Sequence, residues 1–324
     1  MVNQLVLTVT RRCNLRCSYC PTAKDGFPSL DAPSALRALQ LFTERYGGGD
    51  VKLFGGEPLL LPDVVRAVLD AARESRGIRR VYLSTNGLGL DRAFLEQLRQ
   101  NQKLVLTLSM DGRPADHRRL RRALPGVADA YDHVVALLPE LTATPRLVVT
   151  QTIAPSTAGA ACENFEHLLG LGFHRFNFLP GYYVPWRTEQ LQALEAGLAG
   201  ISARIVERWR AGQPLYVRNL FTLAPTPFFN TGVVVDSDGS IHPNNLGLSG
   251  ALDELLPKTR CGTLDDPPSP EALAERAATV NGLLEAALPP GVWGATLAAD
   301  AALSRFCRAL YPEYLAHRAK RRAA

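Results

Sequence analysis

The 324-residue chain lacks any long uncharged apolar run: no segment approaches the roughly 18 residues that a membrane-spanning helix needs. We therefore expect no membrane partner. An apolar stretch begins within a few residues of the N-terminus, so we also expect no signal peptide. Cysteine is scarce, with six residues, and three of these lie between positions 13 and 20. This usage excludes a disulfide scaffold and favours a reducing cytoplasm as the location.

A strongly one-sided charge is missing too, since 36 Lys and Arg stand against 31 Asp and Glu, a net charge of +5. The excess gathers in His117–Arg122 and His317–Arg322. Such clusters could meet nucleic acid, phosphate or an acidic protein, but they also fit a solvated face and a frayed terminus. No aromatic side chains are interleaved with them, so we expect no platform that stacks nucleic-acid bases.

A hydrophobic share of 46% supplies a sizeable core for one large domain with an appendage, or for two domains. Up to Pro180, short apolar runs alternate with helical segments. The predicted strands are Leu5–Thr10, Val51–Phe54, Arg80–Ser84, Leu104–Ser109, Leu147–Ile153 and Phe173–Leu179. The predicted helices are Ser34–Tyr46, Leu61–Ser75, Asp91–Gln100, Val127–Leu138 and Gly159–Leu171. This alternation predicts parallel strands joined by right-handed crossovers.

The second half of the chain follows a different pattern, and we place the domain boundary in Gly181–Trp186, which is rich in Tyr, Pro and Gly. Beyond it the pattern predicts an amphipathic helix, a loop, a hairpin around D-S-D-G and two further helices. These elements are Arg187–Ala211, Thr222–Asn230, Val233–Val235 with Ser240–His242, Pro270–Ala287 and Ala301–Lys320.

Three cysteines gather in the loop directly after Leu5–Thr10. Cys13, Cys17 and Cys20 have C-x3-C-x2-C spacing, with Tyr19 before the third. Three thiolates on one short loop can hold three irons of a four-iron cluster and leave the fourth without a protein ligand, where chemistry can occur. The trio also fits half of a zinc site or a group of buried thiols.

Polar motifs occur where the next predicted strands end. Gly55–Pro58 (G-G-E-P) follows the second strand, Ser84–Gly87 (S-T-N-G) the third and Ser109–Gly112 (S-M-D-G) the fourth. Ligands of such folds gather at the C-terminal ends of the strands, so the shared position predicts a functional rim. Each motif alone also fits ordinary turn chemistry.

With this cysteine loop the chain resembles the radical S-adenosylmethionine (radical SAM) enzymes, whose signature has the same spacing and an aromatic residue in the same position. The resemblance implies that Gly55–Pro58 binds the amino group of the methionine moiety, and that the two later motifs bind ribose and carboxylate. The cofactor-binding residues so implied are Tyr19, Gly55, Gly56, Glu57, Pro58, Ser84, Asn86, Ser109, Asp111 and Arg121, with Thr150 and Leu179 beside adenine, and the cluster ligands are Cys13, Cys17 and Cys20.

The segment Ser109–Gly112 with His117 and Arg121 looks like the S-L-D-G…H-D-x-x-R-G pattern. That pattern is common in the branch with a SPASM or twitch extension, which includes many peptide-modifying enzymes. Here Arg118 and Arg122 replace the aspartate and the glycine.

The resemblance is specific over Val2–Pro180 and weakens beyond it. Val233–Asn244 looks like the hairpin of a SPASM domain, and Cys261–Leu264 (C-G-T-L) like the short motif after it. Asn230 and Asn244, however, stand where thiolates are expected. The extension therefore resembles a degenerate SPASM domain.

Only Cys261 and Cys307 remain in this half of the chain, too few for an auxiliary four-iron cluster. They fit idle thiols. Alternatively, either could donate a hydrogen atom to a substrate radical, which makes them our candidates for a catalytic role.

We therefore expect a partial (β/α)6 barrel over residues 1–182 and an α+β extension over residues 183–324 that covers its open side. The resemblance implies one [4Fe-4S] cluster and S-adenosylmethionine, whose reductive cleavage yields a 5′-deoxyadenosyl radical that takes a hydrogen atom from the substrate. A flavodoxin or ferredoxin would deliver the electron. We expect the substrate to be a natural-product precursor, either a peptide or a small metabolite. The alternative from another class is a non-catalytic scaffold that holds iron–sulfur or zinc.

Overall fold

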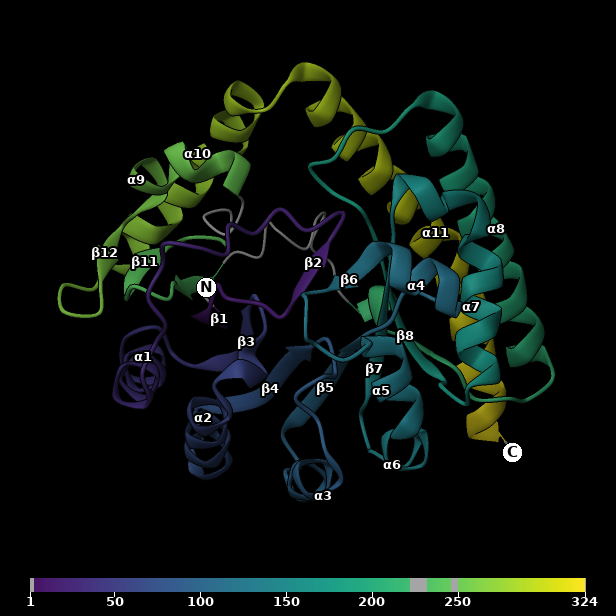
Figure 1. The fold of residues 1–324 in the computed structure, drawn as a ribbon, viewed down its shortest axis with the longest axis horizontal. Coiled ribbons are helices and arrows are strands. Elements are labelled where there is room, and N and C mark those ends of the chain that lie inside the picture. Colours follow the sequence, from purple (N-terminus) through teal and green to yellow (C-terminus); the bar gives the residue numbers. More distant parts are fainter. Residues whose placement is uncertain (1–2, 222–231, 246–249, 324) are drawn as a thin grey trace.

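The computed structural model describes residues 3–221, 232–245 and 250–323. Among these residues ten strands form one curved sheet, surrounded by helices (Figure 1). In sheet order the strands are β12 (Gly262–Thr263), β11 (Ser240–His242), β10 (Val233–Val235), β1 (Gln4–Thr10), β3 (Gly49–Gly55), β4 (Ile78–Thr85), β5 (Leu104–Ser109), β7 (Val148–Ile153), β8 (Arg175–Pro180) and β9 (Tyr216–Val217). Neighbours are parallel from β10 to β9, whereas β10, β11 and β12 pair antiparallel.

Helices follow most of the parallel strands and cover the outer face of the sheet (Figure 1). Their bounds are α1 (Ala32–Arg45), α2 (Pro62–Glu74), α3 (Arg92–Gln100), α4 (Pro114–Leu120), α5 (Ala130–Ala136), α6 (Leu138–Thr142), α7 (Ala161–Gly170), α8 (Thr188–Arg210), α9 (Leu256–Thr259), α10 (Pro270–Ala287) and α11 (Pro290–Ala323). The fold is the predicted α/β class with a partial barrel, and that prediction is confirmed.

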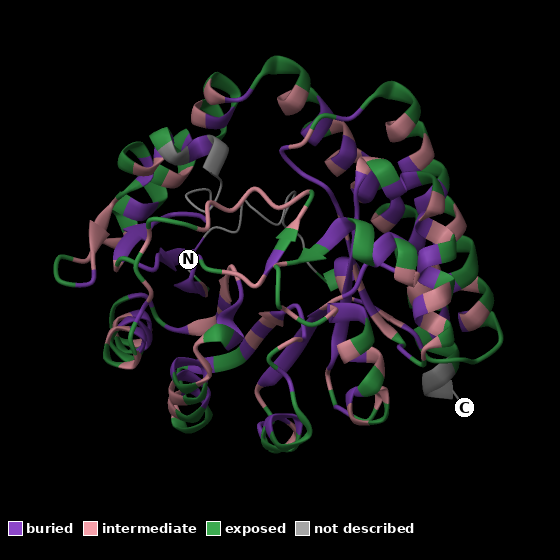
Figure 2. Cartoon of the chain, in the orientation of Figure 1, coloured by how far each residue is buried: buried purple, intermediate pink, exposed green. Residues whose placement is uncertain are grey.

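Helix α1 illustrates why these segments form and where they pack. Asp31 precedes it and accepts a hydrogen bond from the Ser34 backbone N–H at 2.8 Å, which caps the first turn. Its buried side chains are spaced at three and four residues, which makes one apolar stripe: Ala35, Ala38, Leu39 and Phe42. Figure 2 shows the result for the ring of outer helices, whose inner faces are buried and whose outer faces are exposed.

The inner face of the sheet differs from a normal barrel core. On β3, Val51 and Leu53 are fully buried against the helices, whereas Lys52 and Phe54 alternate with them and line an internal cavity. Barrels of this type usually fill their interior with branched apolar side chains. Here the polar inner residues leave a cavity of about 640 Å³.

The hairpin and the last helix attach the C-terminal half to the barrel. Strand β10 pairs in parallel with β1, Val233 opposite Leu5, so the hairpin extends the barrel sheet. Helix α11 packs along α8 and against β8, and it begins at Pro290, earlier than the predicted Ala301. The predicted loop Thr222–Asn230 lies outside the described residues. None of the described helices is long and apolar enough to span a membrane.

Candidate functional site

The cysteine loop lies where β1 ends. In Figure 1 it crosses the centre of the molecule and contains the short strand β2 (Leu15–Cys17). This strand pairs antiparallel with β6 (Arg121–Ala123), Cys17 opposite Arg121. The Ser18 backbone N–H also donates to the Leu120 carbonyl at 2.8 Å. The loop is therefore held by the segment that follows β5, which contains part of the S-M-D-G…H…R pattern.

Each of the three thiols lines the cavity and has a distinct environment. Burial raises the pKa of Cys13, and it raises the pKa of Cys17 to about 12 against the opposing effect of Arg121. Burial also raises the pKa of Cys20, but the Lys24 ammonium, 3.2 Å from its Sγ, and hydrogen bonds outweigh this effect, so the net pKa is lowered.

The donor set fits an iron–sulfur cluster. All three cysteines are free thiols on one loop at one cavity, and the cations Lys24 and Arg121 favour their deprotonated form. Across the described residues, no three His, Cys, Asp or Glu side chains are grouped closely enough to hold a metal ion. Three soft thiolate donors on one loop are the ligands that iron–sulfur clusters take in proteins.

The G-G-E-P segment begins at the end of β3 and contacts the start of the cysteine loop. The Gly56 N–H donates to the Thr10 carbonyl at 2.8 Å, and the Glu57 N–H donates to the Arg12 carbonyl at 2.9 Å. A Cβ on Gly56 would lie 2.1 Å from the Arg12 carbonyl oxygen, so only glycine permits this approach. The glycines thus bring the wall of the cavity against the cluster loop.

Glu57 joins two strand ends. Its buried carboxylate accepts hydrogen bonds from the Thr85 hydroxyl at 2.8 Å and from the Asn86 and Leu59 N–H groups at 2.7 and 3.0 Å. The bond to Leu59 caps the short helix η1 (Pro58–Leu60). Burial raises the pKa of Glu57 to about 6, although these bonds oppose the shift. Pro58, in η1, does not line the cavity.

The carboxylate of Asp111 is enclosed by protein donors. It accepts two hydrogen bonds from Arg121, at 2.8 and 3.0 Å, one from the Tyr19 hydroxyl at 2.9 Å and one from the Thr152 N–H at 3.0 Å. The Asp111 N–H donates to His117 Nδ1 at 3.3 Å. Burial lowers the pKa of His117 to about 4, so its ring is neutral and can accept this bond.

This enclosure changes the interpretation of Asp111. Its side chain is fully buried behind Arg121, and it is not among the cavity-lining residues, whereas Tyr19 and Arg121 are. Asp111 is therefore placed to orient Arg121 and Tyr19 toward the cavity.

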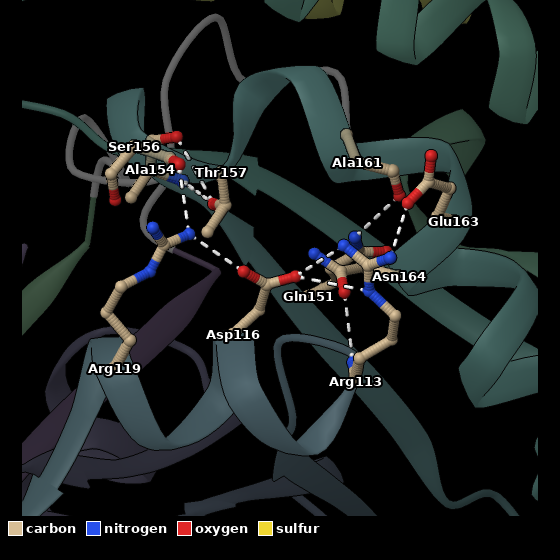
Figure 3. A network of polar contacts seen from close by, with 10 residues as sticks. All are labelled: Arg113, Asp116, Arg119, Gln151, Ala154, Ser156, Thr157, Ala161, Glu163 and Asn164. Atoms are coloured by element: carbon tan, nitrogen blue, oxygen red, sulfur yellow. Dashed lines mark hydrogen bonds and ion pairs between the residues drawn. The ribbon is translucent and has the colours of Figure 1, made fainter.

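A polar network shown in Figure 3 fixes the segment around Asp111. Asp116, on α4, accepts hydrogen bonds from Arg113 at 2.9 Å and Arg119 at 2.7 Å. The Asn164 side chain, on α7, accepts a bond from the Arg113 N–H at 2.9 Å. These contacts tie α4 to the elements after β7. In the sequence, Arg118 was noted only because it replaces the aspartate of the H-D-x-x-R-G pattern. Nothing there indicated that Arg113, Asp116 and Arg119 around it form this network.

Most of the other predicted contacts line the same cavity: Ser84, Asn86, Ser109, Thr150 and Leu179. The Asn86 side chain donates to Asn14 Oδ1 at 2.7 Å and its Oδ1 accepts from the Leu88 N–H at 3.0 Å. It therefore braces the cysteine loop. Hydroxyls of Ser84, Ser109 and Thr150 come from the three neighbouring strands β4, β5 and β7.

The two remaining cysteines are placed differently. Cys307, on α11, lines the cavity beside Ser304 and Arg308, whereas Cys261, before β12, does not. Burial raises the pKa of the Cys307 thiol to about 11, so it is protonated at neutral pH. Of the two candidates only Cys307 faces the cavity. Asn244 is buried, and Asn230 lies outside the described residues.

Sequence reasoning missed an ion pair that anchors the loop. Arg11, fully buried, binds Asp236 of the hairpin turn through two hydrogen bonds, and its guanidinium lies 3.7 Å from the Phe27 ring centroid. In the sequence Arg11 is one of two adjacent arginines before Cys13, and nothing there distinguishes it from a solvent-exposed side chain. The hairpin is thereby fixed to the start of the cluster loop.

The comparisons with known proteins agree with this geometry. The sequence pattern of the Radical SAM superfamily matches residues 7–150. GTP 3′,8-cyclase of Geobacter sulfurreducens is 36% identical over 141 residues, which are 40% of this chain and 42% of that protein. Molybdenum cofactor biosynthesis protein 1 of Bos taurus is 35% identical over 112 residues, 33% of this chain and 17% of that protein. The chain thus spans less than half the length of either relative.

Solved structures share the fold across more of the chain. Native anSMEcpe with bound AdoMet has a TM-score of 0.68 and 20% identity, covering 85% of this chain and 80% of that one. SuiB of Streptococcus suis has a TM-score of 0.62 and 14% identity, covering 92% and 68%. The predicted cofactors, a [4Fe-4S] cluster and S-adenosylmethionine, are those of the family and are confirmed. Residues 7–150 therefore form a domain of the radical SAM superfamily.

Proposed function

We propose that this protein is a radical SAM enzyme that abstracts a hydrogen atom from a biosynthetic precursor. The observation that carries the proposal is the single cavity shared by the three cysteine thiols, the G-G-E-P backbone and the polar strand ends. When bound and reduced, the cluster would supply the electron for cleavage of S-adenosylmethionine, which yields methionine and a 5′-deoxyadenosyl radical. The remaining chemistry is binding, orientation and exclusion of water, which fall to the protein.

The chain's own residues divide these tasks. Cys13, Cys17 and Cys20 would hold the cluster, and the backbone of Gly55 and Gly56 would receive the methionine moiety. Hydroxyls on the ends of β4 and β5 would receive the ribose and carboxylate, and Thr150 on β7 would lie beside the adenine. Arg121 is held in place by Asp111, so it can present its charge without moving.

Residues 183–324 would act as the wall that closes the barrel, a degenerate SPASM-like extension. Support comes from α11, whose residues Leu303, Ser304 and Cys307 line the cavity opposite the strand ends. Closing this side would exclude water from a reactive radical. The electron would come from a flavodoxin or ferredoxin, a partner that we propose on the chemistry alone.

For the substrate we favour a compact metabolite. A cavity of about 640 Å³ must hold S-adenosylmethionine as well as substrate, and pockets for one ligand commonly measure about 300–1,000 Å³. Relatives named GTP 3′,8-cyclase carry a small molecule in their name. A peptide precursor is the second candidate, because neighbours in fold include anSMEcpe and SuiB with bound peptides.

Anaerobic reconstitution with iron and sulfide, followed by dithionite and S-adenosylmethionine, tests the activity. Wild-type protein should release 5′-deoxyadenosine, measured by liquid chromatography, and Cys13→Ala, Cys17→Ala and Cys20→Ala should not. Cys162→Ala is the matched control, because Cys162 lies on α7 away from the cavity. A wild-type protein with a full cluster that forms no 5′-deoxyadenosine would support the scaffold alternative instead.

A further inference from the structure

Two cations lie on the floor of the cavity, below the strand ends. Lys52 projects from the inner face of β3, where its Cα pairs with that of Tyr82 on β4. Arg218 follows β9 at the opposite edge of the barrel sheet, yet its guanidinium carbon lies 4.2 Å from the Tyr82 ring centroid. Arg218 therefore reaches across the barrel interior, and both cations line the same cavity.

Neither cation has an acidic partner among the described residues. Asp50 is the one acidic group that acts on Lys52, and its carboxylate binds Arg79 at 2.9 Å. Glu57 is the one carboxylate among the cavity-lining residues, and its oxygens are occupied by backbone and hydroxyl donors. The floor therefore carries positive charge that the described protein groups leave uncompensated.

The position of Arg218 is enforced by its neighbour. The Asn219 amide accepts a hydrogen bond from the Phe178 N–H at 2.8 Å and donates one to the Phe178 carbonyl at 2.9 Å. These two hydrogen bonds fix the short helix η3 (Arg218–Phe221) against β8. The backbone that carries Arg218 is thus fixed before any ligand arrives, and the side chain rests on the Tyr82 ring, so less freedom is lost on binding.

Burial destabilises the charged form of Lys52. Burial lowers its pKa to about 8, and Arg218 adds to this effect, so the ammonium still exists at neutral pH but in an unfavourable setting. Two strands away on β5, the Thr107 hydroxyl lines the same cavity and is buried without a hydrogen-bond partner among the described groups. Charges and hydroxyls in such a state are normally compensated, and a ligand can supply the compensation.

We propose that Lys52 and Arg218 form an anion subsite that binds a phosphate or carboxylate group of the substrate on the cavity floor. This inference rests on the proposed function and specifies its substrate class as a compact anionic molecule. Lys52 stands three residues before Gly55 on β3, about 10 Å deeper along the strand. An anion held there would point the rest of the substrate up toward the rim. Arg308, on α11 at the exposed side of the cavity, would attract the anion on entry.

Calorimetric titration of the reconstituted protein tests the subsite, with saturating S-adenosylmethionine, no reductant and constant ionic strength. The probes are inorganic pyrophosphate in one arm and succinate in the other, which distinguish phosphate from carboxylate. We expect saturable binding of one of them to wild type. Affinity should fall by about tenfold or more in Lys52→Met and in Arg218→Met, because each removes a charge-assisted contact.

Two further variants make the result decisive. Lys52→Arg keeps the charge and should retain most of the affinity, which separates loss of the charge from other effects of substitution at this position. Arg73→Met removes an exposed cation on α2 and should bind like wild type. If neither pyrophosphate nor succinate binds saturably to wild type, the subsite is overturned. It is also overturned if the probe binds to both Lys52→Met and Arg218→Met with the affinity of wild type.

The failure of this subsite can be told apart from failure of the proposed function. 5′-Deoxyadenosine release is measured on the same wild-type preparation after dithionite is added. Release without anion binding would reject the subsite alone. Anion binding without release would reject the radical SAM activity and leave the subsite standing.

Discussion

Replacing Lys52 by methionine should stabilise the protein at neutral pH while it removes the proposed anion contact. The pKa of Lys52 falls from 10.5 to about 8 in the folded chain. The difference, about 2.5 units, corresponds to about 3 kcal/mol of folding free energy at about 1.4 kcal/mol per unit. This value is an upper bound, because Lys52 is only partly buried by surface area and the cavity admits water.

The sign of the pH dependence follows from proton binding. Between about pH 8 and pH 10.5 the unfolded chain binds the Lys52 proton more tightly than the folded chain, so this residue makes wild-type stability rise with pH. Below pH 8 the full penalty applies to wild type. The advantage of Lys52→Met should therefore be largest near pH 7 and should shrink as the pH approaches 10.

Thermal unfolding of the reconstituted proteins, at about pH 7 and about pH 9.5, measures this effect. A gain of 2–3 kcal/mol should raise the midpoint by about 5 °C, since about 2–4 °C per kcal/mol is typical of chains somewhat shorter than this one. Lys103→Met is the control: its Nζ donates to the Ala72 and Ser75 carbonyls at 2.8 and 2.6 Å, so its loss should destabilise the protein. A midpoint of Lys52→Met at or below wild type at pH 7 would refute the reasoning.

Three further predictions concern the cluster loop and its supports. Iron and sulfide analysis of reconstituted protein should give about four of each per chain, because only Cys261 and Cys307 follow Pro180; about eight of each would contradict a single cluster. Asn86→Ala should assemble the cluster but bind S-adenosylmethionine about tenfold more weakly in equilibrium dialysis, and unchanged affinity would return Asn86 to bracing the loop. Asp236→Asn leaves the Arg11 guanidinium buried without its counter-charge, so unfolding should need about 3–5 kcal/mol less; a loss below about 1 kcal/mol in urea unfolding would show that the pair is dispensable.

The local sequence was sufficient for individual elements in both halves of the chain. The strand Leu104–Ser109, the hairpin strands and the helix Pro270–Ala287 have the predicted bounds. Each depends on short-range information, namely apolar runs, a D-S-D-G turn and a Ser269 cap on the helix. The predicted helix Val127–Leu138 is shorter in the structure, where α5 covers Ala130–Ala136, and a separate helix, α6, begins at Leu138 and was not predicted. Pro139 has no N–H to continue the first helix but fits the first turn of a new one, so the proline that ends the predicted helix also opens α6.

The cysteine spacing and the motifs at the strand ends, both read from the sequence, determined the family and its cofactors. Contacts between distant residues decided the rest. Arg11 meets Asp236, Asp111 is enclosed by Arg121, and Arg218 crosses the barrel to Tyr82. No periodicity or spacing marks such pairs, because each joins residues that only the folded sheet brings together. A lysine in an apolar strand is ambiguous in sequence, and only the tertiary structure placed Lys52 inside the cavity without an acidic partner among the described residues.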